Sequence, residues 1–435
     1  MMGNSFYGEF DETCIGGERD PDYRTVFQRD RDRLIHTFAF RRLQDKTQVF
    51  MSGDYDFYRT RLTHSIEVAQ IGRSICNYLR KEDPALKENF YASPALVEAA
   101  CMAHDLGHPP FGHAGEEVLN ELMDEYDGFE ANAQTLRLLT ETIYDNREGK
   151  GRRGMDPSRG LIDGTLKYKT LRSDHPTGNQ HFIYDRQEHL LNFVMGDNQI
   201  PSDYSPGEER NSLRSLECQI MDWADDTAYS TNDLIDGIRA GFITADDIRE
   251  WSSQQDLSSY EESEIQDLID AIQDGYSEPF LSSRIGTLVE SCSLEERSGF
   301  MSDQTNRYAY NLRIKEEARR TKDLYSDIAH DLLFTSPRVV QLEYKGESML
   351  RKLFGSLTEN YIGEAAEEVN LLPDDVHRRI VNPDHSQASE LEYPSGDYRR
   401  ARLLCDYVAG MTDGFATRTY KRLFDPDFGS IADLV

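Results

Sequence analysis

Three histidines and an aspartate fall between residues 104 and 113, directly after a run of small apolar residues. The run from residue 96 to 103 has a composition typical of a buried helix, so the polar pair His104 and Asp105 at its end needs partners. Adjacent imidazole and carboxylate groups can bind one metal ion. Glycines and prolines then break the helix and keep His108 and His113 on a tight loop near that pair. We interpret this stretch as the floor of a metal site.

Two residues distant in sequence from this pair can complete a ligand set, one before it and one after it. His64 lies on a predicted helix of about residues 59–79. Asp225 lies on the apolar stripe of a predicted helix within residues 213–240, where a carboxylate without a cation would be costly. Two imidazoles and two carboxylates suit Mn²⁺, Fe²⁺, Co²⁺, Ni²⁺ or Mg²⁺ and leave positions for water and a phosphate oxygen. We therefore group as one predicted metal site His64, His104, Asp105 and Asp225.

Such a site hydrolyses phosphoesters, because a bound ion lowers the pKa of its water toward about 7 and polarises the phosphoryl group. His113 and Glu116 follow the metal pair closely enough to protonate a leaving oxygen or to move the proton of the water. A His-Asp dipeptide alone is weak evidence, since the chain has a second one at His330 and Asp331. That pair lacks the Gly-His-Pro-Pro-Phe-Gly-His continuation, and we expect it in an ordinary helix.

The composition limits the classes of partner. The chain has 435 residues, of which 38% are hydrophobic, enough for a sizeable core. Its formal charge is -31, from 48 basic and 79 acidic residues, which argues against nucleic acid as a main partner and leaves at most a single strand in a local basic region. The 11 lysines against 37 arginines on an acidic surface also suggest a high-salt source, which activity in molar KCl would test.

Cysteine use and hydropathy predict a cytoplasmic protein. The six cysteines are scattered without a Cys-x-x-Cys pair, as expected for reduced thiols. The first 30 residues lack a basic start followed by an apolar run. No segment approaches the roughly 18 uninterrupted apolar residues of a membrane span, so we expect no membrane partner.

The hydrophobic periodicity predicts an all-α protein. Apolar residues recur at helical spacing along most of the chain, without alternating strands of any length or a repeat of fixed period. We divide the chain into an irregular N-terminal arm (1–23), a catalytic domain (24–257) and a C-terminal helical region (258–435). A glycine-rich basic loop at 145–159 lies within the catalytic domain and could gate the substrate or be disordered.

The segment from Arg29 to Leu43 is dense in arginine, and Leu34, Phe38 and Leu43 fall near helical spacing within it, which predicts one amphipathic helix. Its charges could form a solvated, ion-paired face or contact a phosphorylated ligand. Spacing alone favours the solvated face, as for most runs of charge.

The order of the predicted ligands resembles that of the HD phosphohydrolase superfamily. Longer stretches resemble the deoxyguanosinetriphosphate triphosphohydrolase (dGTPase, dNTPase) family within it: Phe27 to Phe50, Arg59 to His64, residues 99–113, Gly128 to Gln134, Gly164 to Tyr168, Ala224 to Ser230 and Asp406 to Asp413. Together these stretches cover most of the chain in one order, which makes the resemblance specific.

The resemblance implies an HD-domain helical fold with an additional C-terminal helical region that completes the site and makes oligomer contacts. It implies cleavage of a deoxynucleoside triphosphate, dGTP or several dNTPs, between the 5′ oxygen and the α-phosphorus, which releases deoxynucleoside and tripolyphosphate. Members of the family form tetramers or hexamers, so we expect a homo-oligomer. A dNTP could act as an activator at the subunit interfaces.

By motif position, the resemblance assigns the proton transfers to His113 and Glu116 and the metal to the four ligands named above. Gln48 matches the residue that reads the sugar 3′ hydroxyl, and Tyr229 and Asp233 match sugar-side contacts. A flat Tyr229 ring under the ribose would leave no room for a 2′ hydroxyl. Around the triphosphate, whose about four negative charges need cationic donors, we expect Arg61, His108, Lys167 and Tyr168.

Two positions depart from the family pattern, Ala131 and Asn232, where glycine and histidine are common. Neither is a predicted ligand, so they bear on substrate preference and not on the reaction. An alternative is an HD phosphomonoesterase or phosphodiesterase acting on a nucleoside monophosphate or cyclic nucleotide, which would not need Gln48, Tyr229 and Asp233. A third hypothesis is a nucleotide-sensing or single-strand-binding regulator, against which the intact ligands and the net charge argue.

Overall fold

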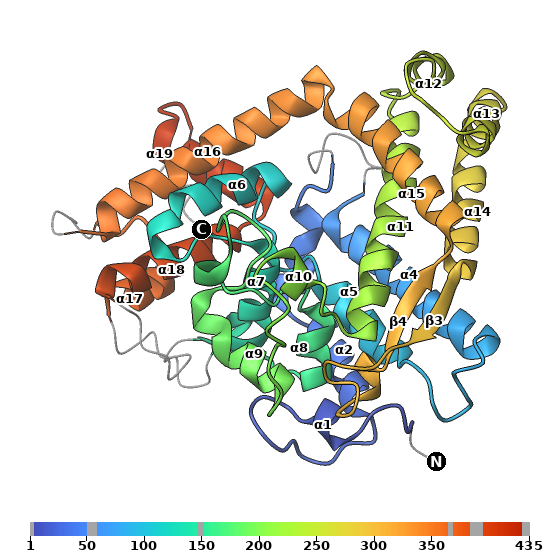
Figure 1. Cartoon of the computed structure of the whole chain (residues 1–435). Helices are drawn as coiled ribbons and strands as arrows, with labels where there is room; N and C mark the ends of the chain where they lie inside the picture. The colour runs from blue at the N-terminus through green and yellow to red at the C-terminus, as the bar shows by residue number, and fades with distance from the viewer. Residues whose placement is uncertain (1–3, 50–58, 146–151, 364–368, 383–394, 429–435) are drawn as a thin grey trace.

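The chain folds into a mainly helical molecule, as the periodicity predicts (Figure 1). This computed structural model describes residues 4–49, 59–145, 152–363, 369–382 and 395–428. The predicted basic loop lies partly outside the described residues, and its flanks pair as β1 (Tyr144–Asp145) and β2 (Arg152–Arg153). Within the described ranges, no helix is both long and apolar enough to cross a membrane.

Three helices form the centre of the molecule, α4 (Arg61–Glu82), α5 (Pro94–Ala103) and α11 (Leu216–Arg239). The hydroxyl of Thr60 accepts a hydrogen bond from the third residue of α4, and that of Ser215 does the same at α11. Such caps satisfy backbone N–H groups that have no partner within the helix and so set where the helix begins. Each end of these three helices lies within three residues of the segment that the periodicity predicts.

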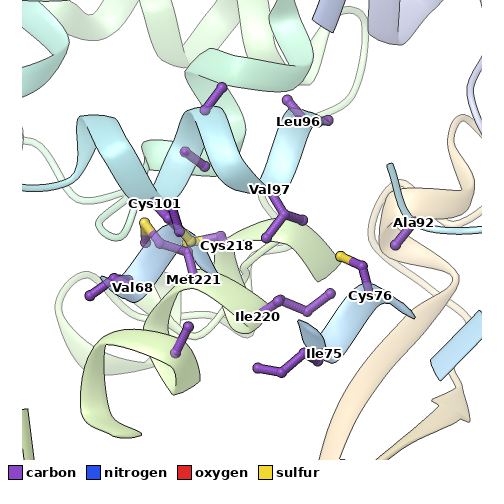
Figure 2. Packing of buried hydrophobic residues seen from close by; sticks show 14 of the residues in the cluster. Val68, Ile75, Cys76, Ala92, Leu96, Val97, Cys101, Cys218, Ile220 and Met221 are labelled. Carbon is purple, nitrogen blue, oxygen red and sulfur yellow. The ribbon is translucent and has the colours of Figure 1, made fainter. Parts of the chain in front are cut away.

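The core between these helices is apolar (Figure 2). Val97 and Cys101 of α5 pack against Ile75 and Cys76 of α4, all of them buried. A Cβ at Gly72 would lie 2.8 Å from the Cys101 sulfur, so the glycine allows α4 and α5 to approach closely. All six cysteines are free thiols, as predicted. This packing fixes the ends of α4 and α5 beside the middle of α11.

Further helices surround this centre. On the N-terminal side they are α1 (Glu9–Glu12), α2 (Val26–Ile35), α3 (Phe38–Arg42), α6 (Gly112–Leu122), α7 (Ala131–Arg137), α8 (Arg159–Thr165), α9 (Glu188–Met195) and α10 (Glu208–Asn211). Downstream they are α12 (Ala245–Ser252), α13 (Ser259–Gln273), α14 (Ser277–Glu290), α15 (Glu316–Ala329), α16 (Pro337–Tyr361), α17 (Asp374–Val381), α18 (Gly396–Ala409) and α19 (Asp413–Phe424).

The C-terminal helices form a second apolar core with the residues that follow the metal stretch. Helix α16 packs along α6 and also contacts α18 and α19 (Figure 1). Phe111 and Leu119 are buried in this core with Leu350, Phe354 and Leu404. The boundary placed between residues 257 and 258 stays a prediction, but the C-terminal helices contact the metal stretch directly.

Two local predictions are wrong. The arginine-rich segment forms two helices, because Thr37 caps α3 by accepting from the Phe40 N–H. This break shifts the helical register, so Phe38 is 68% exposed while Leu34 and Leu43 are buried. The expectation of no strands also missed a two-stranded antiparallel sheet of β3 (Cys292–Glu296) and β4 (Tyr310–Ile314). The residues of β4 do alternate between apolar and polar, but the run is only five residues long and its partner β3 is mostly polar.

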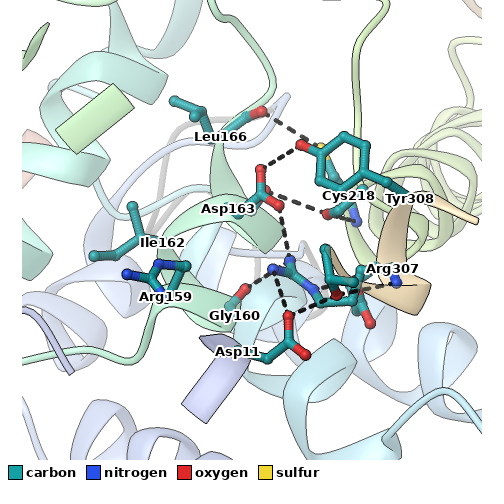
Figure 3. A network of polar contacts seen from close by, with 12 residues as sticks. Asp11, Arg159, Gly160, Ile162, Asp163, Leu166, Cys218, Arg307 and Tyr308 are labelled. Atoms are coloured by element: carbon teal, nitrogen blue, oxygen red, sulfur yellow. Dashed lines mark hydrogen bonds and ion pairs between the residues drawn. The ribbon is translucent and has the colours of Figure 1, made fainter. Parts of the chain in front are cut away.

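A buried set of ion pairs, here called the Arg307 network, joins distant parts of the chain (Figure 3). The Arg307 side chain donates from Nε to Glu217 Oε2 at 2.9 Å and lies with Nη2 3.1 Å from Asp163 Oδ2. The other Asp163 oxygen accepts from Lys169 Nζ at 3.0 Å and from the Tyr308 hydroxyl at 2.9 Å. The network therefore consists of Arg307, Asp163, Glu217, Lys169 and Tyr308, each with charged or hydrogen-bonding partners.

Candidate metal centre

The four predicted ligands lie together at the meeting point of α4, α5 and α11. His64 is in the first turn of α4, His104 and Asp105 follow α5 directly, and Asp225 is in the middle of α11. The distance from His64 Nε2 to Asp225 Oδ1 is 3.1 Å, and that from His104 Nε2 to the same oxygen is 3.4 Å. Ligand atoms of His64, His104 and Asp105 all lie within 4.8 Å of one another, and all three residues are buried.

The hydrogen bonds of His104 leave one ring nitrogen for a ligand. Nδ1 lies 2.6 Å from the Cys101 carbonyl oxygen, so Nδ1–H donates to it. Nε2 is buried and has no hydrogen-bond partner among the described residues. Metal-binding histidines commonly donate their second N–H to a carbonyl in this way. Imidazole nitrogens and carboxylate oxygens that face one point therefore fit a divalent metal ion.

Asp105 is held as a carboxylate between two basic side chains. Arg61 Nη1 lies 3.0 Å from Asp105 Oδ2, and His108 Nδ1 lies 3.0 Å from Oδ1. Burial opposes the charge, but His104, Arg61 and His108 outweigh it and lower the pKa of Asp105 well below its usual range. Burial and Arg61 lower the pKa of His108, so its ring is neutral at pH 7 and Nδ1–H can donate to Asp105. Arg61 and His108 thus lie at the centre, where a phosphate would need donors.

Asp225 is balanced by Lys167, whose Nζ lies 3.1 Å from Asp225 Oδ2 and 3.2 Å from Asp222 Oδ1. Burial opposes the charge on Asp225, but His104 and Lys167 outweigh it and lower its pKa well below the usual range. Burial also opposes the charge on His104, but Asp105 and Asp225 raise the pKa of His104 to about 9. A metal ion that binds here must therefore displace a proton from His104.

The loop after Asp105 rests on α7. A Cβ at Gly107 would lie 2.0 Å from the Ala131 carbonyl oxygen, so only glycine fits this approach. The Gly107 N–H donates to Thr135 Oγ1 at 2.9 Å. These contacts fix the path of the chain between Asp105 and His113.

His113 lies in the first turn of α6 and Glu116 follows it by three residues, beside this loop. His113 Nδ1 is 3.5 Å from Glu116 Oε2, and the ring centroids of His113 and His108 are 5.7 Å apart. Glu116 Oε1 accepts a hydrogen bond from the Ala131 N–H at 2.7 Å, which holds this carboxylate in place. The His113 side chain is 76% exposed, so it can exchange protons with solvent or a ligand. His108, His113 and Glu116 also lie close enough together to hold a cation.

Tyr229 and Asp233 follow Asp225 by one and two turns of α11 and so lie on the same side of the helix. The Tyr229 ring stacks on Phe334 with parallel planes and centroids 5.8 Å apart. Asp233 is buried, its Oδ2 has no hydrogen-bond partner in the described chain, and burial raises its pKa well above the usual range. Gln48 likewise has a buried Oε1 that no described group donates to.

Tyr168 lies next to Lys167 in the chain, and its ring stacks on that of His181 with centroids 4.8 Å apart. Sequence reasoning did not single out Arg214 or Asp222. Arg214 Nη1 lies 2.5 Å from Asp222 Oδ2, and its Nε donates to the Lys167 carbonyl at 3.2 Å. Asp222 precedes Asp225 by nearly one helical turn, a spacing that could have identified it.

The second His-Asp pair lies apart from the centre. His330 and Asp331 are exposed and open a π-helical turn, η7 (His330–Phe334), that continues α15 where an ordinary α-helix was expected. The Trp251 indole N–H donates to Asp331 at 2.8 Å. This second pair therefore makes contacts at the surface. The residues that follow a His-Asp pair distinguish this surface pair from the pair at the metal centre.

Comparison with known proteins agrees with this geometry. Residues 61–230 match the HD domain, and residues 312–422 match the phosphohydrolase-associated domain. The chain is 32% identical to a deoxyguanosinetriphosphate triphosphohydrolase-like protein of Shewanella loihica, over 97% of this chain and 98% of that protein. It is 33% identical to such a protein of Deinococcus radiodurans, over 95% and 96%, and 34% identical to one of Shewanella woodyi, over 96% of both chains.

Proposed function

This chain belongs to the deoxyguanosinetriphosphate triphosphohydrolase-like family of HD-domain phosphohydrolases, and we propose that it hydrolyses deoxynucleoside triphosphates, dGTP or several dNTPs, to deoxynucleoside and tripolyphosphate. One observation supports this substrate above the others. Near the metal residues, Gln48 and Asp233 carry buried polar atoms without hydrogen-bond partners in the described chain. Such atoms are costly unless a ligand binds them.

We assign the divalent metal ion to His64, His104, Asp105 and Asp225, whose nitrogen and oxygen atoms converge. Mn²⁺, Mg²⁺, Co²⁺, Ni²⁺ and Fe²⁺ all suit this donor set. When bound, the ion would lower the pKa of a water molecule and polarise the α-phosphoryl group.

The basic side chains at the centre would bind the triphosphate. Arg61 and Lys167 are each buried against a carboxylate, which orients their charged ends toward the metal residues. His108 Nδ1 lies 3.0 Å from Asp105 Oδ1, and its other ring nitrogen would donate to the phosphate when the negative charge of the bound triphosphate protonates the ring. Tyr168, next to Lys167 in the sequence, would contact the triphosphate at a phosphate farther along.

His113 and Glu116 would supply the proton for the leaving 5′ oxygen. Burial opposes the charge on Glu116, but His113 and His108 outweigh it and lower the pKa of this carboxyl group. His113, whose Nδ1 lies 3.5 Å from Glu116 Oε2, would donate a proton to the 5′ oxygen as the bond to the α-phosphorus breaks.

The sugar would lie against α11. Gln48 Oε1 can accept a hydrogen bond from the 3′ hydroxyl, and burial raises the pKa of Asp233, which favours the protonated form that can donate one. The Tyr229 ring would pack under the ribose and exclude a 2′ hydroxyl. These three residues distinguish the proposal from a phosphomonoesterase or phosphodiesterase, which needs only the metal residues.

Family resemblance further supports a cytoplasmic homo-oligomer, a tetramer or hexamer, with a dNTP activator at subunit interfaces. Light scattering with and without added dNTPs would measure the number of subunits.

The test is to incubate the protein with each dNTP and GTP, singly and in pairs, with Mn²⁺ or Mg²⁺, and to identify the products. Equal amounts of deoxynucleoside and tripolyphosphate from a dNTP are expected, with little turnover of GTP as substrate. Orthophosphate or pyrophosphate as the product would instead support the monoesterase or diesterase alternative.

A further inference from the structure

One carboxylate of the C-terminal helical region accepts hydrogen bonds from two loops of the predicted catalytic domain, one that contains Gln48 and one that runs from His108 to His113. Asp413, the first residue of α19, is 2% exposed. Its Oδ2 accepts from the Thr47 N–H at 2.8 Å and from the Thr47 hydroxyl, and its Oδ1 accepts from the Phe111 N–H at 3.0 Å. Thr47 precedes Gln48, and Phe111 lies between His108 and His113.

A second contact joins the same parts of the chain. Lys46 is 2% exposed, and its ammonium group donates to the Ala409 carbonyl at 2.9 Å and also to the His108 carbonyl. Ala409 ends α18, so the turn between α18 and α19 reaches both loops through two neighbouring residues, Lys46 and Thr47.

The backbone at Phe111 needs such support. Its φ is +66°, in the left-handed region that residues with a side chain rarely adopt. A conformation of this kind persists only where surrounding contacts hold it. The Asp413 carboxylate provides one of these contacts at the Phe111 N–H, and the C-terminal core packs against the ring.

We propose that Asp413 is a positioning residue that sets the distance between the Gln48 loop and the His108 to His113 loop. The proposal rests on the proposed function, because Gln48 would bind the sugar while His108 and His113 would act at the phosphate and the leaving oxygen. A substrate that spans both loops gains from their fixed spacing, since catalysis depends on simultaneous alignment of its two ends.

Asp413→Asn tests this proposal. Asparagine keeps one acceptor oxygen, but its NH₂ group faces an N–H donor, so one hydrogen bond is lost. We expect kcat/KM for a dNTP to fall roughly 10- to 100-fold, the usual cost of a hydrogen bond to a charged group. Metal content should not change, because Asp413 contacts none of the four metal residues in the described chain. Asp427→Asn, an exposed position just after the same helix, is the matched control and should keep full activity.

A double-mutant cycle separates positioning from general stability. If Asp413 acts through Gln48, the pair Asp413→Asn and Gln48→Ala loses clearly less activity than the product of the two single losses. Multiplying effects, or a kcat/KM for Asp413→Asn within twofold of the native value, would overturn the proposal. Thr47→Val removes only the hydrogen bond from the Thr47 hydroxyl to Asp413 and is a milder variant in case Asp413→Asn does not fold. It should show a smaller loss of kcat/KM and the same coupling with Gln48→Ala.

Amide hydrogen exchange provides a readout that does not depend on the substrate. The N–H groups of Thr47 and Phe111 should exchange faster in Asp413→Asn without any nucleotide present. Faster exchange without dNTP hydrolysis by the native protein would mean that the proposed substrate is wrong and the loop coupling is right. Unchanged exchange would contradict the coupling itself.

Discussion

The metal centre and the Arg307 network are both buried groups of charged side chains in the described part of the chain, and they differ in the partners of their charges and in their exposure. Arg307 and Lys169 have charged partners within 3.1 Å, and the two carboxylates also accept from the hydroxyls of Tyr308 and Tyr7. Each group has one buried atom that lies in an ion pair without a hydrogen bond among the described residues, Asp163 Oδ2 in the network and His104 Nε2 at the metal centre. The network pairs Arg and Lys side chains with carboxylates, whereas the metal centre places two imidazole rings against Asp225 Oδ1. The two groups also differ in exposure, because the side chains of Arg307, Asp163 and Lys169 are at most 1% exposed while that of Asp225 is 23% exposed.

The difference between the two groups indicates which buried charged side chains can bind a ligand. The Arg307 network closes on itself and ties the loop before β4 to α8 and α11, so its role is structural. The metal centre places two carboxylates and two imidazoles close together, and His104 Nε2 lies 3.4 Å from Asp225 Oδ1 without a hydrogen bond among the described residues. An unsatisfied buried polar atom is costly in a folded protein, and a bound cation would remove that cost here.

The largest expected effect is the loss of activity in Asp105→Ala. Removing this carboxylate takes away a metal ligand and the partner of Arg61 and His108. We expect turnover to fall on the order of a thousandfold or more, as when an essential member of a catalytic set is removed. Steady-state kinetics with dNTP substrates measures it, and full activity in this variant would contradict the site assignment.

Arg307→Met should disrupt the Arg307 network without changing the reaction at the metal centre. Loss of the guanidinium leaves Glu217 and Asp163 with fewer buried partners, so the free energy of unfolding should fall by about 3–5 kcal/mol. Urea denaturation measures this change. The kcat/KM of the folded protein should stay within about twofold; a large loss of activity at native-like stability would mean that the two groups are not separate.

Two lysines that are two residues apart give a matched pair. Lys167 pairs with Asp225 at the metal centre, and Lys169 pairs with Asp163 in the network. Lys167→Met should lower kcat/KM roughly 10- to 100-fold with a small change in stability. Lys169→Met should lower the free energy of unfolding by about 2–3 kcal/mol and keep activity. The opposite pattern, in kinetics and urea denaturation of both variants, would refute the distinction.

The smallest expected effect is a dependence on pH in the ion-free protein. The folded pKa of His104 is about 9, above its unfolded value of about 6.5. Its contribution to stability is therefore complete below pH about 6.5 and is lost as the pH rises to about 9, on the order of 2 kcal/mol. Urea denaturation of chelator-treated protein at both pH values measures the loss, which should be smaller in His104→Gln and unchanged in Arg307→Met. An equal loss in His104→Gln would assign the effect to other groups.

Much of the metal centre follows from local sequence. His104, Asp105 and the loop to His113 are adjacent in the chain, and the periodicity of α4 and α11 indicates which faces are buried, so His64 and Asp225 could be chosen. Their roles toward a nucleotide came only from family resemblance, because spacing within a helix does not show which ligand binds.

The Arg307 network and Asp413 could not be predicted in the same way. Arg307 meets Glu217 and Asp163 from 90 and 144 residues away, and Asp413 meets Thr47 from 366 residues away. Charged residues at such separations look like ordinary surface positions in a sequence. Phe38 was misplaced for a related reason, because one cap at Thr37 changes the register of all residues that follow.

Metal titration tests the central claim most directly. Calorimetry with Mn²⁺ on ion-free protein should show binding to the native chain and to Arg307→Met with similar affinity, and no measurable binding at this site in Asp225→Asn. The native chain should also release a proton as the ion binds, because His104 must deprotonate. Unchanged Mn²⁺ affinity in Asp225→Asn, or no binding to the native chain, would contradict the assignment of this group as a metal centre.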